Sequence, residues 1–166
     1  FETLHAAGHD MGLKLCGMHM MDAGRIEKGF RHFGHDITCE DHVLEAGLGF
    51  AVKADKPSFI GREAVLAKKE KGLSKRLVQF KLTDPEPLLY HNEPIMRNGE
   101  VVSFLTSGVY GHHLGAAMGM GYIPCEGESA ADLLGSTYEI DVMGVKVKAE
   151  ASLKPFYDPR GDRAKA

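Results

Sequence analysis

The chain has 166 residues, of which 43% are hydrophobic and 26% charged, and its formal net charge is −3. This composition is typical of a globular protein, and the length suffices for one domain, or for one domain and part of another. The small negative charge disfavours nucleic-acid binding, and no apolar run approaches the roughly 18 residues of a membrane span. The three cysteines are scattered and odd in number, so we expect neither disulfides nor a zinc site. We expect a reduced location, in the cytoplasm or, in a eukaryote, the mitochondrial matrix.

The first part of the chain predicts helices around one short strand. Helical spacing of apolar residues indicates a helix over 1–11, which Gly12 would end. A short strand over 13–17 and a short helix over 20–25 follow. Because the chain opens at Phe1, inside a predicted helix and without an initiator methionine, we expect a fragment with an upstream portion missing.

The next stretch predicts two further helices and a strand. Thr38 is a possible N-cap for a short helix, and a strand is expected over 50–53. The polar crossing over 53–57 suits a domain boundary. A helix over 58–71 would follow and end at Gly72.

Beyond residue 75 the spacing of apolar residues changes to two, which predicts strands. The alternation over 76–82 indicates a half-buried strand. Asn98-Gly99 predicts a type I′ hairpin turn. The strand after this turn, over 101–105, would end at Thr106.

The sequence over 138–149 predicts a hairpin together with its register. Met143-Gly144 would form the two-residue turn. The pairs on the solvent face would then carry opposite charges: Asp141 with Lys146 and Glu139 with Lys148. Opposite charges favour this register and disfavour a slip by one residue.

Six sequence blocks occur in a fixed order along the chain: Arg25-Ile-Glu-Lys-Gly-Phe-Arg, Leu44-Glu-Ala-Gly-Leu, Phe59-Ile-Gly-Arg-Glu-Ala, Leu105-Thr-Ser-Gly, Gly121-Tyr-Ile-Pro-Cys and Lys154-Pro-Phe-Tyr-Asp-Pro. Together they resemble the C-terminal half of the aminomethyltransferase (glycine-cleavage T-protein) family. The run Phe30-Arg-His-Phe-Gly-His-Asp-Ile is most similar to the branch that ends the FAD-dependent sarcosine and dimethylglycine dehydrogenases.

The resemblance implies an α+β fold in four parts. Residues 1–57 would be the end of a folate-binding α+β domain, and 58–75 would be a connecting helix. Residues 76–159 would form a small antiparallel β-barrel, and 160–166 a frayed tail. The periodicity indicates the short strands, whereas barrel closure follows only from the resemblance.

The resemblance also implies a tetrahydrofolate site, with Glu27 as its first candidate residue. A pterin ring presents an N–H beside an exocyclic amine, and one carboxylate can accept hydrogen bonds from both. The alternative is a structural salt bridge from Glu27 to Arg25 or Arg31.

Four further residues are candidates for the folate site. Lys53 and Lys56 could meet the carboxylate tail of the folate, or they could be solvated surface lysines. Arg62 could contribute to the same site or act structurally at a helix start. Phe33 could pack beside the pterin, with core packing as the alternative.

His32 and His35 are candidates for a metal site, because Cys39 and His42 follow them closely in the sequence. The pattern fixes no third or fourth ligand, so we predict no metal site.

No activated nucleophile is recognisable in the chain. Ser107 lacks a Gly-x-Ser-x-Gly context, and Cys125 has no evident base. His112 and His113 are interpreted as loop residues. The catalytic aspartate of the family belongs to the portion that would precede this chain.

The resemblance therefore implies part of a folate-dependent one-carbon-transfer enzyme. An FAD domain upstream would oxidise a small N-methyl amine, and the carbon would be captured as 5,10-methylenetetrahydrofolate. The fragment alone would then be inactive. The alternatives are a free-standing aminomethyltransferase partnered by a lipoyl carrier protein, a folate-dependent demethylase, and a non-catalytic folate-binding module.

Overall fold

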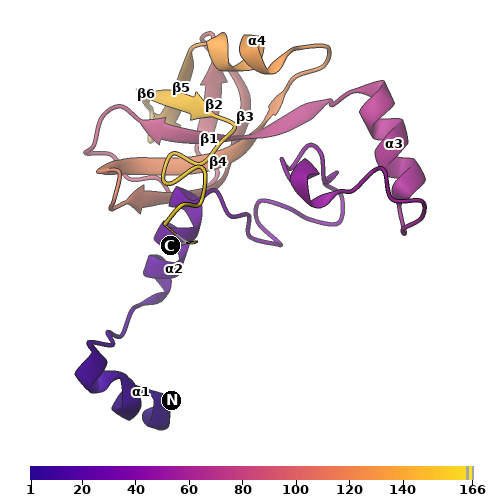
Figure 1. Cartoon of the computed structure of the whole chain (residues 1–166). Helices are drawn as coiled ribbons and strands as arrows, with labels where there is room; N and C mark the ends of the chain where they lie inside the picture. The colour runs from indigo at the N-terminus through magenta and orange to yellow at the C-terminus, as the bar shows by residue number, and fades with distance from the viewer. Residues whose placement is uncertain (164, 166) are drawn as a thin grey trace.

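The second half of the chain closes into a barrel of six antiparallel strands in the computed structural model, which describes residues 1–163 and 165 (Figure 1). The strands are β1 (Lys75–Leu82), β2 (Pro94–Arg97), β3 (Glu100–Gly111), β4 (Ala116–Pro124), β5 (Tyr138–Val142) and β6 (Val145–Ser152). Their order around the barrel is β1-β4-β3-β2-β5-β6, and β6 pairs with β1 to close it. The barrel implied by the family resemblance is thus confirmed.

The barrel is filled by one face of each strand. Val78, Phe80 and Leu82 alternate along β1 and are almost completely buried in the interior. Ile95 of β2 and Ile140 of β5 are fully buried in the same cluster. The period-two pattern in the sequence therefore identified the inward face of β1.

Both two-residue hairpin turns form as predicted. Asn98 and Gly99 have φ angles of 54° and 89°, and Met143 and Gly144 have the same values. Positive φ at both central residues is the type I′ geometry, which matches the twist of the flanking strands. The β5–β6 register pairs Asp141 with Lys146 and Glu139 with Lys148, as the charge pattern predicted.

In the described part of the chain, four α-helices accompany the barrel: α1 (Glu2–Gly8), α2 (Met18–Glu27), α3 (Arg62–Lys71) and α4 (Ala130–Gly135). A 3-10 turn, His9–Met11, continues α1 up to Gly12, which has the left-handed φ of 78° expected of a helix end. In Figure 1, α1 stands apart from the barrel, whereas α2 lies against it. Among the described residues, no helix is long and apolar enough to cross a bilayer.

Three of the predicted elements are wrong. The segment over 13–17 pairs with no strand. Thr38 begins a tight turn instead of a helix, and in this turn its backbone N–H and its hydroxyl both donate to the carboxylate of Asp41. The strand expected over 50–53 is replaced by a 3-10 turn, Gly49–Ala51.

Other elements were predicted with wrong limits. Helix α3 begins at Arg62, four residues late, because Gly61 before it takes a left-handed φ of 84°. Strand β3 does not end at Thr106 but continues to Gly111. Within the predicted tail, positions 164 and 166 lie outside the described residues.

A second apolar cluster joins α2 to the outside of the barrel. Ile26 of α2 is fully buried against Leu77, Met118 and Met120. The amide of Gln79, also buried, donates to the carbonyl of Ile26. Strand β1 is therefore covered on both faces, not half-buried as its alternating pattern indicated. This packing fixes the end of α2, where Glu27 lies.

Candidate functional site

Glu27 is the last residue of α2, and only 2% of its surface is exposed. Its Oε1 accepts a hydrogen bond from the backbone N–H of His113, and its Oε2 lies 2.7 Å from Nδ1 of the same residue. Gly111 leaves room for the carboxylate, because a Cβ there would lie 3.2 Å from Oε1. A buried carboxylate is thus matched to two donors from a single residue.

His113 lies in the turn between β3 and β4, and its side chain is 60% exposed. Its ring packs on that of Tyr157, with the ring centroids 4.7 Å apart. The backbone N–H of Tyr157 in turn donates to the carbonyl of Glu27, at 3.3 Å. Three distant segments therefore meet at Glu27: α2, the β3–β4 turn and the C-terminal segment.

Arg25, one of the expected salt-bridge partners of Glu27, instead binds Asp36. Its Nη1 lies 2.6 Å from a carboxylate oxygen of Asp36, which is fully buried. The hydroxyl of Thr106 donates to the other oxygen of Asp36, also at 2.6 Å. Ser107 accepts from Nη2 of Arg25, so its hydroxyl is a structural partner. This network attaches the loop after α2 to strand β3.

Arg31, the other expected partner, also acts within the fold. Its Nε donates to the carbonyl of Ala46, at 2.9 Å, and burial lowers the pKa of its guanidinium. Gly47 lies beside it with a left-handed φ of 69°, and a Cβ there would lie 2.7 Å from Nη2 of Arg31. The salt-bridge alternative for Glu27 therefore forms with neither arginine.

Glu45 gives the Leu-Glu-Ala-Gly block a structural role. Its carboxylate, almost fully buried, lies 2.6 Å from Nζ of Lys68 and accepts from the backbone and hydroxyl of Ser74. Burial alone would raise the pKa of Glu45, but the hydrogen bonds from Lys68 and Ser74 lower it to about 2. Glu45 thus locks its turn to the junction between α3 and β1.

Two of the predicted folate residues come together around a pocket. Lys53 and Lys56 line a cavity of about 360 Å³, together with Ala51, Val52 and Phe59. Arg62 is adjacent, because its Nε donates to the carbonyl of Lys56 at 3.0 Å. Glu27 and Phe33 do not line this pocket.

Phe33 lies in the loop after α2, and 70% of its surface is exposed. The alternative of core packing for Phe33 is therefore wrong, and its packing beside a pterin stays a prediction.

His32 and His35, the histidines considered for a metal site, line a pocket with two further histidines. The rings of His32 and His35 are 4.5 Å apart, and both line a cavity of about 250 Å³ with His19 and His91. Among residues 1–163 and 165, no three His, Cys, Asp or Glu side chains are placed to share a metal ion.

The sequence indicates a loop at His113 but no partner for its side chain. Glu27 and His113 are 86 residues apart, so no local pattern connects them. Glu27 and His113 come into contact because α2 packs against the barrel.

Two family models match the chain. The model described as glycine cleavage T-protein C-terminal barrel domain matches residues 75–158, and that described as GCVT N-terminal domain matches residues 1–56.

Three curated relatives each match between 74% and 99% of the chain. It is 44% identical, over 98% of its length, to 4-methylaminobutanoate oxidase (formaldehyde-forming) of Paenarthrobacter nicotinovorans, and covers 19% of that protein. It is 37% identical over 99% of its length to human mitochondrial sarcosine dehydrogenase, of which it covers 18%. An aminomethyltransferase of Halothermothrix orenii is 45% identical over 74% of this chain, which covers 34% of that protein. The chain thus spans about a fifth to a third of the length of these relatives.

A solved structure has the same fold. The crystal structure of glycine cleavage system aminomethyltransferase T from Bartonella henselae matches 95% of this chain with a TM-score of 0.81 and 25% identity. The match covers 44% of that protein.

Proposed function

Because the chain belongs to the glycine-cleavage T-protein family, we propose that it forms the C-terminal part of a tetrahydrofolate-dependent one-carbon-transfer enzyme. The observation that carries the proposal is similarity, over 74% to 99% of the chain, to relatives named for aminomethyl transfer or for oxidation of methylated amines. When bound, tetrahydrofolate would accept a one-carbon unit. The residues of this chain would bind and orient it.

Glu27 suits the role of pterin ligand by its burial and by its remaining acceptor capacity. The donors of His113 occupy one lone pair on each carboxylate oxygen, and each oxygen has a second. Two parallel donors of a pterin would match these acceptors. A charge-assisted pair in a buried position is strong, so Glu27 would fix the orientation of the ring.

Lys53 and Lys56 suit the acidic end of the same ligand. Both lysines line a pocket that has Phe59 and Val52 as apolar walls. Arg62 would support them by holding the carbonyl of Lys56. Phe33, which is exposed, would supply an aromatic surface for the pterin.

Within the longer protein, residues 1–57 would complete a folate-binding domain, and 58–75 would connect it to the barrel over 76–159. The relatives with 44% and 37% identity favour a flavin-dependent oxidation of a small N-methyl amine, with FAD bound upstream. The aminomethyltransferase with 45% identity supports the second candidate, a free-standing aminomethyltransferase with a lipoyl carrier protein. Reading the coding sequence upstream of Phe1 separates the two. A strand, Gly-x-Gly-x-x-Gly and a helix there indicate a dinucleotide-binding domain.

The binding proposal is tested by the affinity of the complete protein for tetrahydrofolate, measured by calorimetry under reducing conditions. Glu27→Gln keeps the size of the side chain but removes its charge, so we expect affinity to fall by about tenfold to a hundredfold. Glu40→Gln, at an exposed acid, is the matched control and should bind like the parent. Circular dichroism checks that each variant is folded. Equal affinity of the Glu27→Gln variant and the parent would show that Glu27 is not a folate ligand.

A further inference from the structure

A separate pocket of about 440 Å³ lies between the end of α3 and the turn over 125–128. It is lined by Leu44, Lys69, Gly72, Leu73, Arg76, Cys125, Gly127 and Glu128. None of the candidate folate residues contributes to it. Its walls are fixed, because the backbone N–H of Cys125 donates to the carbonyl of Ser74 at 3.0 Å, and that of Glu128 donates to the carbonyl of Cys125 at 3.1 Å.

Arg76, the second residue of β1, lines this pocket, and its side chain carries an unpaired donor. Its Nε is buried and has no hydrogen-bond partner among the described residues. A guanidinium is always charged, and a buried donor without an acceptor is costly. The site therefore favours a ligand that supplies an oxygen acceptor and a negative charge.

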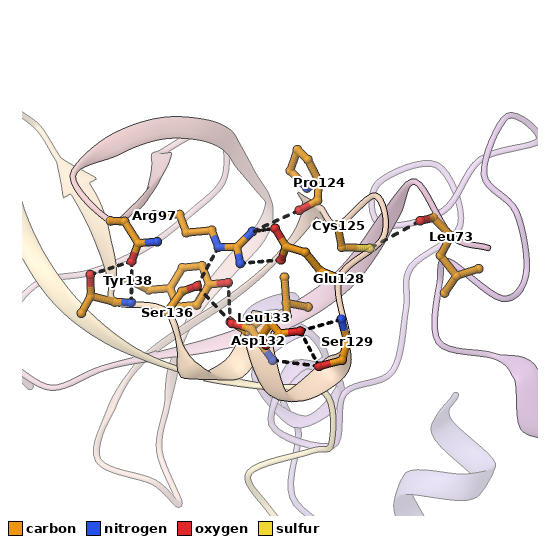
Figure 2. Close-up of polar contacts among 12 residues, drawn as sticks. Leu73, Arg97, Pro124, Cys125, Glu128, Ser129, Asp132, Leu133, Ser136 and Tyr138 are labelled. Atoms are coloured by element: carbon orange, nitrogen blue, oxygen red, sulfur yellow. Dashed lines mark hydrogen bonds and ion pairs between the residues drawn. The ribbon is translucent and has the colours of Figure 1, made fainter.

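The neighbouring groups do not neutralise Arg76. Glu128 is the only carboxylate in the lining, and both of its oxygens are bound by Arg97, at 3.1 and 2.5 Å. Figure 2 shows this pair, with the guanidinium of Arg97 facing Glu128 and the sulfur of Cys125 turned toward Leu73. Burial raises the pKa of the Cys125 thiol, so the thiol stays neutral. Lys69 adds a second positive charge at the rim.

We propose that this pocket binds a small organic acid, with its carboxylate on Arg76 and its apolar body against Leu44, Leu73 and Cys125. The planar guanidinium matches a carboxylate, and Lys69 adds attraction without a fixed direction. The apolar walls favour a ligand with a hydrocarbon body over an inorganic anion. This proposal is independent of the folate site.

The test uses benzoate as the probe and benzamide as its neutral isostere. Chemical shifts of the labelled chain are followed by NMR at constant ionic strength. We expect saturable benzoate binding with a Kd of about 1 mM, given the affinity usual for a ligand of this size. Shifts should concentrate on residues that line the pocket. Benzamide should bind at least about tenfold more weakly, because it lacks the charge.

Two variants and a matched control complete the test. Arg76→Gln should weaken benzoate binding by about tenfold to a hundredfold, and Lys69→Gln by less. Lys71→Gln removes the same charge from the same helix outside the pocket and should leave binding unchanged. If the Arg76→Gln variant fails to fold, the comparison of benzoate with benzamide and the Lys69→Gln variant still test the proposal. Absence of saturable benzoate binding, equal binding of benzamide, or full binding by a folded Arg76→Gln variant would each overturn the proposal.

Discussion

Acid should weaken the fold through Glu45, the carboxylate that joins its turn to Lys68 and Ser74. Its folded pKa is about 2, against an ordinary value of 4.5. A depressed folded pKa gives stability that is fully present above the unfolded pKa and lost as the pH falls toward the folded one. The window in which the fold loses this contribution therefore runs from about pH 5 down to about pH 2.

The size of the effect follows from the same two pKa values. Because one pKa unit corresponds to roughly 1.4 kcal/mol, ionised Glu45 contributes at most about 3 kcal/mol at pH 7. At pH 3.5 the contribution falls to about 2 kcal/mol by the same relation. Glu45→Gln imitates the protonated carboxyl, so it should lower the free energy of unfolding by these amounts.

Urea unfolding at both pH values, followed by circular dichroism, measures this difference. With an m-value of about 2 kcal/mol per molar, the midpoint for Glu45→Gln should fall by about 1.5 M at pH 7 and by about 1 M at pH 3.5. Glu150→Gln is the control, because the side chain of Glu150 is 54% exposed and its pair with Lys81 should contribute less than about 1 kcal/mol. An equal loss at both pH values would show that the charge of Glu45 is not what stabilises the turn.

Two predictions concern backbone geometry in the barrel. Gly121→Ala should cost about 1–3 kcal/mol in urea unfolding, because a Cβ there would lie 2.5 Å from Cδ1 of Ile95 and 2.8 Å from the carbonyl of Phe104. Gly135→Ala has no atom within 4 Å of the new Cβ and should cost nothing, so similar losses for both would refute the steric explanation. Met143→Asn should raise the melting temperature by about 2–4 °C, because Met143 holds a φ of 54° that asparagine tolerates better. An unchanged melting temperature would indicate that this turn carries no strain.

The elements that were predicted correctly are those set by neighbouring residues. The Met143-Gly144 turn, its paired charges and the alternation in β1 are all visible within a few residues. Closure of the barrel required the family resemblance, because β1 meets β6 across about 70 residues. Strand β4 was not predicted at all, since Gly119 and Gly121 interrupt its pattern.

The candidate site was only partly predictable for the same reason. The proximity of Lys53 and Lys56 follows from their spacing in the chain. The contact between Glu27 and His113 depends on how α2 packs against the outside of the barrel. The apolar residues over 13–17 suggested a strand. In the structure Leu13 and Leu15 are exposed, so these side chains do not pack in a core that would stabilise a strand.

The attachment of α2 to the barrel has a consequence for dissection of the protein by proteolysis. Cleavage between residues 53 and 61 would cut the chain without separating its parts. Ile26 would remain buried against Met118, and Asp36 would still accept from Thr106. The nicked protein should therefore migrate as one particle under native conditions and as two bands after denaturation.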